Sequence, residues 1–536
     1  MLYSDATTPA TVVPAPGLLI KISSGGRDVD LRYDANSRLA AASASGSTMA
    51  TYSYDEARPE LLTGVKFADG STRSYLYEPA LNPLQAAWSE SDMTARLSQV
   101  AGIAQQQYTG PSSTADIVQL IIGRASRSGL TGILDENASR YATYTYDTQG
   151  RVSAESHGAN VETYGFNYLS SLAQTVVTDS LGTASTRNYA NIGGVLRMTS
   201  QTQAAGSGCT ASTRQQSFDT NGNTIQKDDF NGTRTCYAYD TARNLPTTRV
   251  EGLNNTAACS TYVASGAALP AGTRKTSTQW HPDWRLATKV AEPGRITTHV
   301  YNGQPDPFNG NAVANCASAQ LPDGKPLPVL CKTVEQATTD SDGRLGFSAA
   351  LQAGVTSPVW RYTYNANGKI LSATDPRGKT TTHTYYSDTT ADHAVGDLAT
   401  VTDTVGLTTQ YPKYNAHGQL LRTVDANGAT TDYTYDLRQR LTSANVAGQN
   451  TLYEYWPTGL LKKVTQPDGN WIAYAYDAAH RLTDVSDKDG NSVHYTLDNA
   501  GNRTQEQAKD PSGALSRQMS RVMDALSRVQ QATGRE

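Results

Sequence analysis

The sequence has little of what membrane spans and nucleic-acid surfaces require. None of its apolar runs approaches the roughly 20 residues of a membrane-spanning helix. The 536 residues carry 45 Lys and Arg against 49 Asp and Glu, a formal net charge of −4, so no basic excess is available to neutralise phosphates. Charged residues make up only 18% of the chain, and Phe occurs 6 times. We therefore expect no membrane span and no nucleic-acid partner.

Cysteine is also scarce. The five cysteines Cys209, Cys236, Cys259, Cys316 and Cys331 show no CxxC spacing, and the eight histidines form no pair at metal-ligand spacing. We expect no metal and no cofactor. Cys316 and Cys331 flank a Pro- and Gly-rich loop, 321–328, which a disulfide could close in an oxidising compartment. Isolated buried thiols explain the same residues equally well.

Signals for catalysis are missing as well. There is no Gly-x-Ser-x-Gly elbow and no phosphate-binding glycine loop. Nearly every Asp stands in a turn phrase, where capping explains it. Asp487-Lys488-Asp489-Gly490-Asn491 looks like the start of a calcium loop but lacks the distal Glu, and His281-Pro282-Asp283-Trp284 is best interpreted as a structural corner. We expect a protein that is not an enzyme. Residues 1–17 show neither a basic nor an apolar signal-peptide region.

What the chain does have is tyrosine, 30 residues, and glycine, 44 residues. A Tyr followed by Asp or Asn recurs, and neighbouring anchors such as Tyr414 and Tyr435 stand 21 residues apart. A fixed period of this length indicates a repeat architecture. The anchors are Tyr33, Tyr54, Tyr146, Tyr239, Tyr301, Tyr364, Tyr414, Tyr435 and Tyr476, with variants at Tyr77, Tyr168, Tyr189, Phe218, Trp280, Tyr386, Tyr455 and Leu497.

One repeat predicts two short strands and two turns. Tyr433 and Tyr435 alternate with polar residues, as in a strand with one face half-buried. After the anchor, the Asp caps a turn through its side chain and a Gly supplies a positive φ. Two strands with two hairpin turns use about twenty residues, so successive repeats should form a long antiparallel meander. The turn residues singled out are Asp34, Asp147, Gly150, Asp219, Gly222, Asp436 and Asp477.

Four segments follow from where the period holds. Residues 1–17 form an N-terminal extension, 18–85 are repeats, 86–130 are a helical insertion in which apolar residues recur at helical spacing, and 131–536 are repeats. The spacings between Tyr239 and Trp280 and between Tyr301 and Tyr364 indicate repeats with eroded anchors and longer loops. The last segment could form an amphipathic helix, but Met523-Asp524 copies the anchor phrase, and we favour a strand there.

The repeated phrase resembles a known family. Tyr33-Asp34-Ala35-Asn36-Ser37-Arg38-Leu39, Tyr146 to Val152 and Tyr476 to Leu482 closely resemble the YD repeats of the RHS family. That family includes bacterial polymorphic toxins, the B and C components of Tc toxin complexes and teneurins. The resemblance covers roughly residues 18 to 530. It implies an all-β meander that spirals into a hollow cocoon, here a partial one, around a C-terminal toxic or effector domain.

One motif departs from the family. The self-cleaving members carry Pro-x-x-x-x-Asp-Pro-x-Gly-Leu, whereas this chain has Asp510-Pro511-Ser512-Gly513-Ala514-Leu515, with Gln505 in place of the leading Pro. We do not carry self-cleavage over to this sequence. Because the array reaches the last residues, exposed strand edges are expected, and further chain or another polypeptide would have to cover them.

The sequence therefore predicts a non-catalytic shell segment that carries a toxin or effector, supplied by a continuation of the chain or by another polypeptide, in toxin delivery or interbacterial competition. The anchor tyrosines would form the cavity wall, or simply the packed face of the sheet. The alternative is a carbohydrate-binding or adhesive cell-surface protein, because exposed aromatic rings stack on sugars. Expected partners are a cargo polypeptide or a complementary shell chain, with glycans as a further candidate. The expected location is secreted or at the cell surface.

Overall fold

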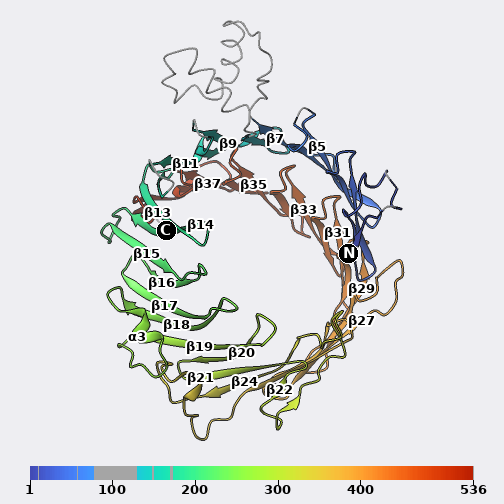
Figure 1. Cartoon of the computed structure of the whole chain (residues 1–536). Helices are drawn as coiled ribbons and strands as arrows, with labels where there is room; N and C mark the ends of the chain where they lie inside the picture. Colours follow the sequence, from blue (N-terminus) through green and yellow to red (C-terminus); the bar gives the residue numbers. More distant parts are fainter. Residues whose placement is uncertain are drawn as a thin grey trace.

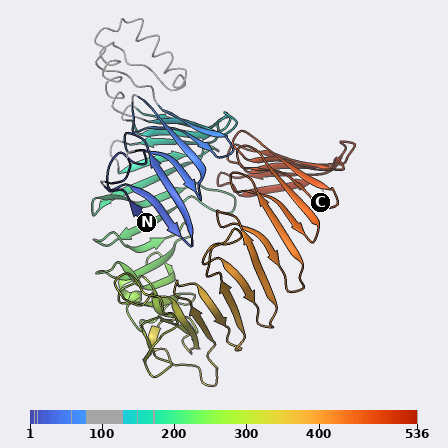
Figure 2. The same ribbon diagram turned by 90° about the vertical axis from the view of Figure 1, so that its right-hand side faces the viewer.

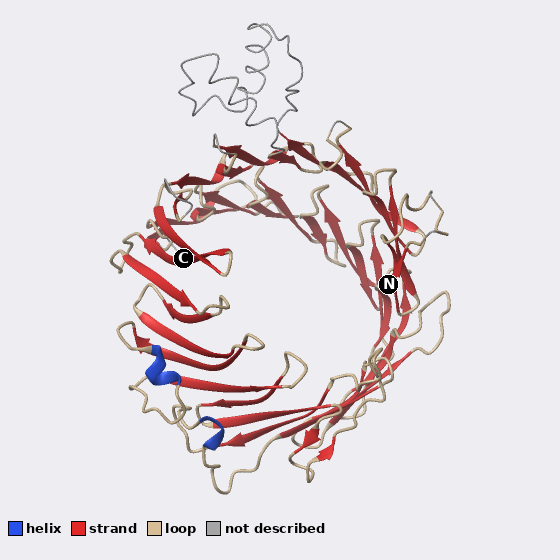
Figure 3. Ribbon diagram, in the orientation of Figure 1, coloured by secondary structure: helices blue, strands red, loops and turns tan. Residues whose placement is uncertain are grey.

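The computed structural model describes residues 1–5, 7–9, 11–56, 58–77, 129–147, 150–169 and 173–534. Nearly every element in these residues is a β-strand. Their two helical elements are short: α3 (Cys259–Val263) and the 3-10 helix η1 (Gly346–Ser348) (Figure 3). The predicted all-β fold is confirmed. The helical insertion expected at 86–130 lies outside the described residues, except for its last two, of which Leu130 begins a strand.

One sheet of 38 strands contains almost all of these elements, and its strands pair antiparallel with their neighbours in chain order. The sequence thus folds as the predicted meander. The first part comprises β1 (Leu2–Tyr3), β2 (Leu19–Ser24), β3 (Arg27–Tyr33), β4 (Leu39–Ala44), β5 (Ser47–Tyr54), β6 (Leu62–Phe67), β7 (Thr72–Tyr77), β8 (Leu130–Leu134), β9 (Arg140–Tyr146), β10 (Val152–His157), β11 (Val161–Tyr168), β12 (Gln174–Thr178), β13 (Ala184–Ile192), β14 (Val195–Gln203), β15 (Ser212–Phe218), β16 (Thr224–Asp228), β17 (Thr233–Asp240), β18 (Leu245–Asn254), β19 (Arg274–Trp280), β20 (Ala287–Glu292) and β21 (Arg295–Tyr301).

The second part continues the same sheet. It comprises β24 (Leu330–Ala337), β25 (Val359–Tyr364), β26 (Ile370–Thr374), β27 (Thr380–Tyr385), β28 (Leu398–Thr402), β29 (Thr408–Tyr414), β30 (Leu420–Val424), β31 (Thr430–Tyr435), β32 (Leu441–Val446), β33 (Gln449–Tyr455), β34 (Leu461–Thr465), β35 (Trp471–Tyr476), β36 (Leu482–Asp487), β37 (Ser492–Leu497), β38 (Arg503–Lys509), β39 (Leu515–Met523) and β40 (Val529–Gly534). A separate hairpin is formed by β22 (Pro305–Asp306) and β23 (Ala312–Val313).

The structure settles three details of the repeat pattern. Strands β39 and β40 pair across the Met523-Asp524 turn, so the favoured strand assignment is confirmed over a helix. The anchor near 386 is Tyr385, which ends β27, and Tyr386 belongs to the following loop. The two wide spacings hold no eroded repeats. A long loop carrying α3 follows β18, and the β22–β23 hairpin lies in the loop between β21 and β24.

A β-bulge accompanies the anchor in nearly every repeat. Thr434 on β31 pairs with Ser443, but Tyr435 pairs with Leu441, which leaves Thr442 as an extra residue on β32. Such a bulge bends the strand and increases its right-handed twist. Since it recurs once per repeat at the same place, the bends add up and the sheet curves. The same slip occurs at Tyr33, Tyr54, Tyr77, Tyr146, Phe218, Tyr239, Trp280, Tyr301, Tyr364, Tyr385, Tyr414, Tyr455, Tyr476, Leu497 and Met523.

The curved sheet winds around an open interior and does not close on itself (Figure 1). After one turn the C-terminal strands lie beside the N-terminal ones, so the sheet forms a first winding and the beginning of a second (Figures 1 and 2). The chain exposes 29465 Å² of surface. A compact protein of 57.4 kDa would expose about 19,000 Å². This excess is what a wall one sheet thick should show, because such a wall has solvent on both faces.

The turn glycines allow a test of the local geometry. Gly428 has a φ of +82° and open space where a Cβ would stand, so Gly428→Ala should cost about 1 kcal/mol through backbone strain alone. Gly165 in β11 has ordinary extended backbone and serves as the control, for which Ala should be neutral or slightly stabilising. Amide hydrogen exchange should report faster opening of β30 and β31 only in Gly428→Ala; equal effects at both positions would contradict the assigned turn.

Candidate functional site

The anchor tyrosine fastens each repeat to the strand before it. Tyr435, the last residue of β31, donates its hydroxyl hydrogen to the carbonyl of Leu420, the first residue of β30, at 3.0 Å. The bond gives a partner to a carbonyl at a strand end. The same bond, at 2.7–3.1 Å, is made by Tyr33, Tyr54, Tyr146, Tyr239, Tyr301, Tyr364, Tyr385, Tyr414 and Tyr455.

These tyrosines are half-buried, and burial raises the hydroxyl pKa of Tyr54, Tyr239, Tyr301, Tyr364, Tyr385, Tyr414, Tyr435 and Tyr455. A raised pKa keeps the hydroxyl protonated, so it remains a hydrogen-bond donor at neutral pH. Three predicted anchors, Tyr77, Tyr168 and Tyr476, make no such bond with the described residues.

The Asp that follows the anchor caps the turn with its side chain, at the position that the sequence indicates. Oδ1 of Asp436 accepts the backbone N–H groups of Arg438 and Arg440, and Oδ2 accepts Nε of Arg440 at 2.6 Å. Asp34, Asp147, Asp477 and Asp524 bind the Arg four residues later in the same way, while Asp219 binds Asn223. Gly150 and Gly222 take a positive φ in these turns, a conformation that Ser37, Gln439 and His480 adopt where glycine is absent.

In several repeats, the turn arginine forms a contact with the anchor ring of the next repeat. The guanidinium carbon of Arg440 lies 4.9 Å from the centre of the Tyr455 ring, and Arg38 and Arg151 lie 4.3 Å from the rings of Tyr54 and Tyr168. Such cation–π contacts contribute about 0.5–1 kcal/mol each where partly exposed. The repeated phrase therefore contacts both of its neighbours in the sheet. Its Tyr forms a hydrogen bond to the preceding strand, and its Arg lies over the ring of the following anchor.

Trp280 and His281 show that the same roles can be filled by other residues. The indole Nε1–H of Trp280 donates to the carbonyl of Pro246 at 2.8 Å, as the tyrosine hydroxyl does elsewhere. Nδ1 of His281 accepts the backbone N–H groups of Asp283 and Trp284, which replaces the capping Asp. The predicted structural corner is confirmed.

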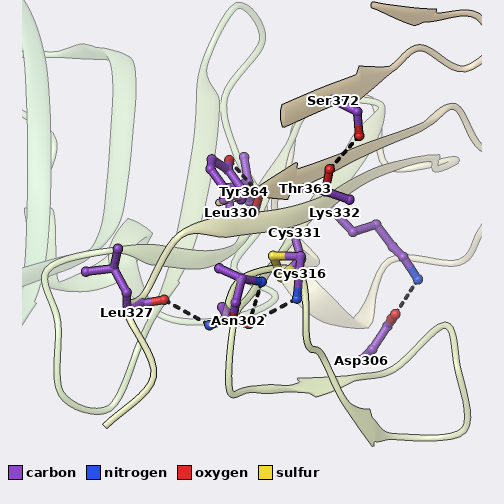
Figure 4. The surroundings of a disulfide bond; sticks show 11 residues. Asn302, Asp306, Cys316, Leu327, Leu330, Cys331, Lys332, Thr363, Tyr364 and Ser372 are labelled. Carbon is purple, nitrogen blue, oxygen red and sulfur yellow. Dashed lines mark hydrogen bonds and ion pairs between the residues drawn. A yellow bond between two sulfur atoms is a disulfide. The ribbon is translucent and has the colours of Figure 1, made fainter. Parts of the chain in front are cut away.

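Two disulfides hold loops against the sheet. Cys316 and Cys331 are joined, and Asn302 beside them accepts the N–H of Cys316 and donates to the carbonyl of Leu327 (Figure 4). Cys236 in β17 is joined to Cys259 at the start of α3, a pairing that the sequence reasoning missed because nothing in the 23-residue separation signals it. Cys209 is free.

A polar seam joins the two windings, because turns of the second winding lie on hairpin ends of the first. Arg27 and Asp397, which are 370 residues apart, form a bidentate ion pair in which both nitrogen–oxygen distances are 2.6 Å. Oγ of Ser45 donates to the carbonyl of Ala416 at 2.7 Å, and Oγ1 of Thr183 donates to that of Ala525 at 2.9 Å. The contacts follow chain order on both sides, so the seam is in register.

The middle of the seam contains a buried carboxylate. The side chain of Glu136, in the turn between β8 and β9, is fully buried and pairs with Arg73 at 3.0 Å and with Arg438 of the second winding at 3.3 Å. Arg438 also lies 4.2 Å from the centre of the Phe67 ring. Next along, His480 meets Asp135 at 3.0 Å and stacks on Tyr141. No signal in the sequence connects these residues.

The residues that the structure describes contain neither a metal-binding cluster nor a helix that could span a membrane. Within them, no group of His, Cys, Asp and Glu side chains is arranged to hold a metal ion. None of their helices combines the length and the apolar character that crossing a membrane requires.

Comparisons with known proteins give one family match. The model of the RHS Repeat family matches residues 414–451, 455–492 and 476–515. No curated protein sequence matches the chain. Among solved structures, the chain is similar to the crystal structure of TcdB2-TccC3 (14% identity, 92% of this chain and 33% of that one, TM-score 0.35) and to the same complex without the hypervariable C-terminal region (13%, 97% and 36%, TM-score 0.36).

A structure of the Tc holotoxin pore of Photorhabdus luminescens is also similar (13% identity, 94% of this chain and 37% of that one, TM-score 0.29). The chain thus spans about a third of the length of these solved chains. The low identities and TM-scores carry no conclusion about activity or partners.

The anchor bond predicts different effects for two tyrosines of one strand. Tyr435→Phe removes the donor to the Leu420 carbonyl and should lower the local free energy of opening by about 1 kcal/mol. Tyr433→Phe, on the same face, removes a hydroxyl with no partner among the described residues and should have little effect. Hydrogen exchange of the β30–β32 amides distinguishes the two, and equal exchange in both variants would argue against the ladder.

The seam predicts that one arginine holds the windings together. Arg27→Ala leaves a mostly buried Asp397 unpaired and should weaken the seam by about 2 kcal/mol. Arg422→Ala is the matched control, because its pair with Asp432 is half-exposed and joins the neighbouring strands β30 and β31 of one winding, where under about 1 kcal/mol is expected. Small-angle scattering should show a larger maximum dimension for Arg27→Ala only; unchanged dimensions and unchanged exchange at 389–397 would refute the role.

His281 predicts a loss of stability in acid. Burial lowers the pKa of its imidazole from the ordinary 6.5, while Asp283 raises this pKa by a smaller amount and Arg243 lowers it slightly further. Below pH 6.5 the unfolded chain takes up a proton that folded His281 resists, so this stability is present above 6.5 and is lost as the pH falls, at up to about 1.4 kcal/mol per pH unit. His281→Asn keeps an acceptor for the turn but does not titrate. Its melting temperature should fall less between pH 7.5 and 5.5 than that of the wild type.

Proposed function

The chain is an RHS-repeat protein, and on that premise we propose that it is a segment of a shell that encloses and carries a toxin or effector polypeptide. The observation that supports this most is the wall itself: one curved sheet, wound around an open interior and held to itself by a seam (Figures 1 and 2). Anchor tyrosines, turn aspartates and turn arginines are engaged in holding the wall and the seam together. The proposed role is therefore structural and not catalytic, in toxin delivery with interbacterial competition as the setting.

The face with the tyrosines is proposed to line the interior. The anchors of this face are committed to the wall, because their hydroxyls bind backbone carbonyls. The other tyrosine of each pair, such as Tyr433, Tyr453 or Tyr474, has a hydroxyl without a partner in the described part of the chain. A ring with a free hydroxyl can contact both apolar and polar segments of an unfolded guest. We therefore assign cargo contact to these tyrosines and wall-building to the anchors.

Completion of the shell is proposed to come from further repeats, in this chain or in a complementary shell chain. Strand β40 pairs with β39 on one side, and its six residues are exposed. Such a strand edge offers unpaired N–H and C=O groups to another strand. The seam offers a matching surface, since its contacts advance in register along the hairpin ends of the first winding up to the β14–β15 turn, where Ser207 binds Asp524.

The disulfides support a location outside the reducing cytosol. Cys236–Cys259 and Cys316–Cys331 both close loops beside the sheet, and disulfides persist in oxidising compartments. We propose that the protein works after secretion or at the cell surface.

Protease protection of a tethered passenger tests the proposal. A short unstructured peptide fused after Glu536 should be cleaved by thermolysin several times more slowly than the same peptide fused to a compact domain. The fusion that also carries Arg27→Ala, which opens the seam, should lose most of this protection, whereas Arg422→Ala should retain it. Cleavage at one rate in all four proteins would overturn the shell function.

A further inference from the structure

One repeat departs from most of the others at two positions of the same turn. After anchor Tyr455 the sequence reads Trp456-Pro457-Thr458-Gly459-Leu460, so Trp stands where other turns have the capping Asp, and Leu460 stands where Arg440 stands one repeat earlier. The backbone turn is kept, since the N–H of Trp456 donates to the carbonyl of Leu460 at 2.8 Å. This repeat therefore lacks the arginine that, at the same position one repeat earlier, lies over the ring of the next anchor.

The next anchor is Tyr476, and its surroundings differ accordingly. Where a cation occupies the position, it lies over the following ring, as Arg440 does over Tyr455 and Lys369 does over Tyr385. Tyr476 has no cation over its ring in the described part of the chain. Its hydroxyl also lacks the bond to the preceding strand that most anchors make. Among the described residues, this ring thus has neither a cation over its face nor a hydrogen-bond partner for its hydroxyl.

The space that the missing arginine leaves is a cavity. It measures about 350 Å³ and lies in the seam, lined by Leu460 and Tyr476 from the second winding and by Asp135, Asn137 and Ser139 from the first. This volume is in the range of ligand-binding pockets, which begin at roughly 300 Å³. Trp456 and Thr458 complete one side. Since both windings contribute, a ligand bound here would touch both.

The lining offers acceptors and negative charge. Asp135 brings a carboxylate against the imidazole of His480, while the carboxylate of Asp477 is paired with Arg481. The Asp135 side chain is only 4% exposed. Its Oδ2 accepts a hydrogen bond from Nε2 of His480 and can accept a second one from another donor. The hydroxyls of Ser139, Thr458 and Tyr476 and the amide of Asn137 have no protein partner among the described residues. A group rich in donors and positively charged is the complement of this lining.

We propose that this cavity, called here the seam pocket, binds a guanidinium group. The ligand would place its flat cation over the Tyr476 ring, as the repeat's own arginines do over other anchors, and donate N–H groups to Asp135 and to the neighbouring hydroxyls. A guanidinium carries five donors and no acceptor, which matches an acceptor-rich lining better than an ammonium does. The group can come from an arginine side chain of a polypeptide or from a free guanidinium compound.

Titration calorimetry on the full chain tests the assignment. N-acetyl-L-arginine amide should bind, and the neutral isostere N-acetyl-L-citrulline amide should bind about tenfold more weakly, because charge and aromatic contact are both lost. The lysine analogue should also be weaker. Tighter binding of a short peptide with a central arginine than of methylguanidinium would identify a polypeptide as the source, and the reverse order would identify a free compound.

A filled pocket provides the decisive variant. Leu460→Arg places the chain's own guanidinium over Tyr476 and should abolish binding while raising the melting temperature, which also shows that the variant folds. Gln419→Arg puts the same side chain at the same repeat position one anchor before Tyr435, outside the seam pocket, and should leave binding unchanged. Undiminished binding to Leu460→Arg would overturn the proposal. So would binding of glucose, but not of N-acetyl-L-arginine amide, to the wild type.

Discussion

The hydrogen bond from an anchor tyrosine to the first carbonyl of the preceding strand is the constraint on which the rest of the structure depends. A wall one sheet thick has few buried side chains, so apolar packing alone cannot fix its geometry. The tyrosine hydroxyl ties each strand end to its neighbour at the point where the bulge shifts the register, as Tyr435 does with Leu420. The bond and the bulge coincide at most anchors, and the regular spacing of the bulges curves the sheet.

The repeated phrase joins neighbouring repeats because some of its residues contact the preceding strand and others contact the following one. Tyr binds backwards, Asp closes the turn, and Arg reaches forward to the next ring. The substitutions respect these roles. Trp280 keeps the donor and His281 keeps the acceptor, so that turn is preserved. The Trp456 repeat keeps the turn but gives up the forward arginine, and there the structure has the seam pocket instead of a filled contact.

The seam is a different kind of contact from the sheet. Neighbouring strands are joined by a continuous ladder, but the two windings meet only at turns, through ion pairs such as Arg27–Asp397 and through backbone carbonyls. Polar contacts between turns stabilise less than the continuous backbone hydrogen bonds between neighbouring strands, and dissolved salt screens the exposed ion pairs. The wall is therefore held firmly along the chain and more loosely between windings.

The sequence by itself determined the local structure. A period of 21 residues, alternation at Tyr433 and Tyr435, and the Asp and Gly of each turn were enough to predict an antiparallel meander and its turns, because strands and hairpin turns depend on neighbours along the chain. Only the tertiary structure decided the Cys236–Cys259 pairing, the bulges, the burial of Glu136 and the seam pocket. The burial of Glu136 and the seam pocket depend on curvature summed over many repeats, which brings together residues more than 300 positions apart, such as Arg438 and Glu136, and no local pattern records that sum.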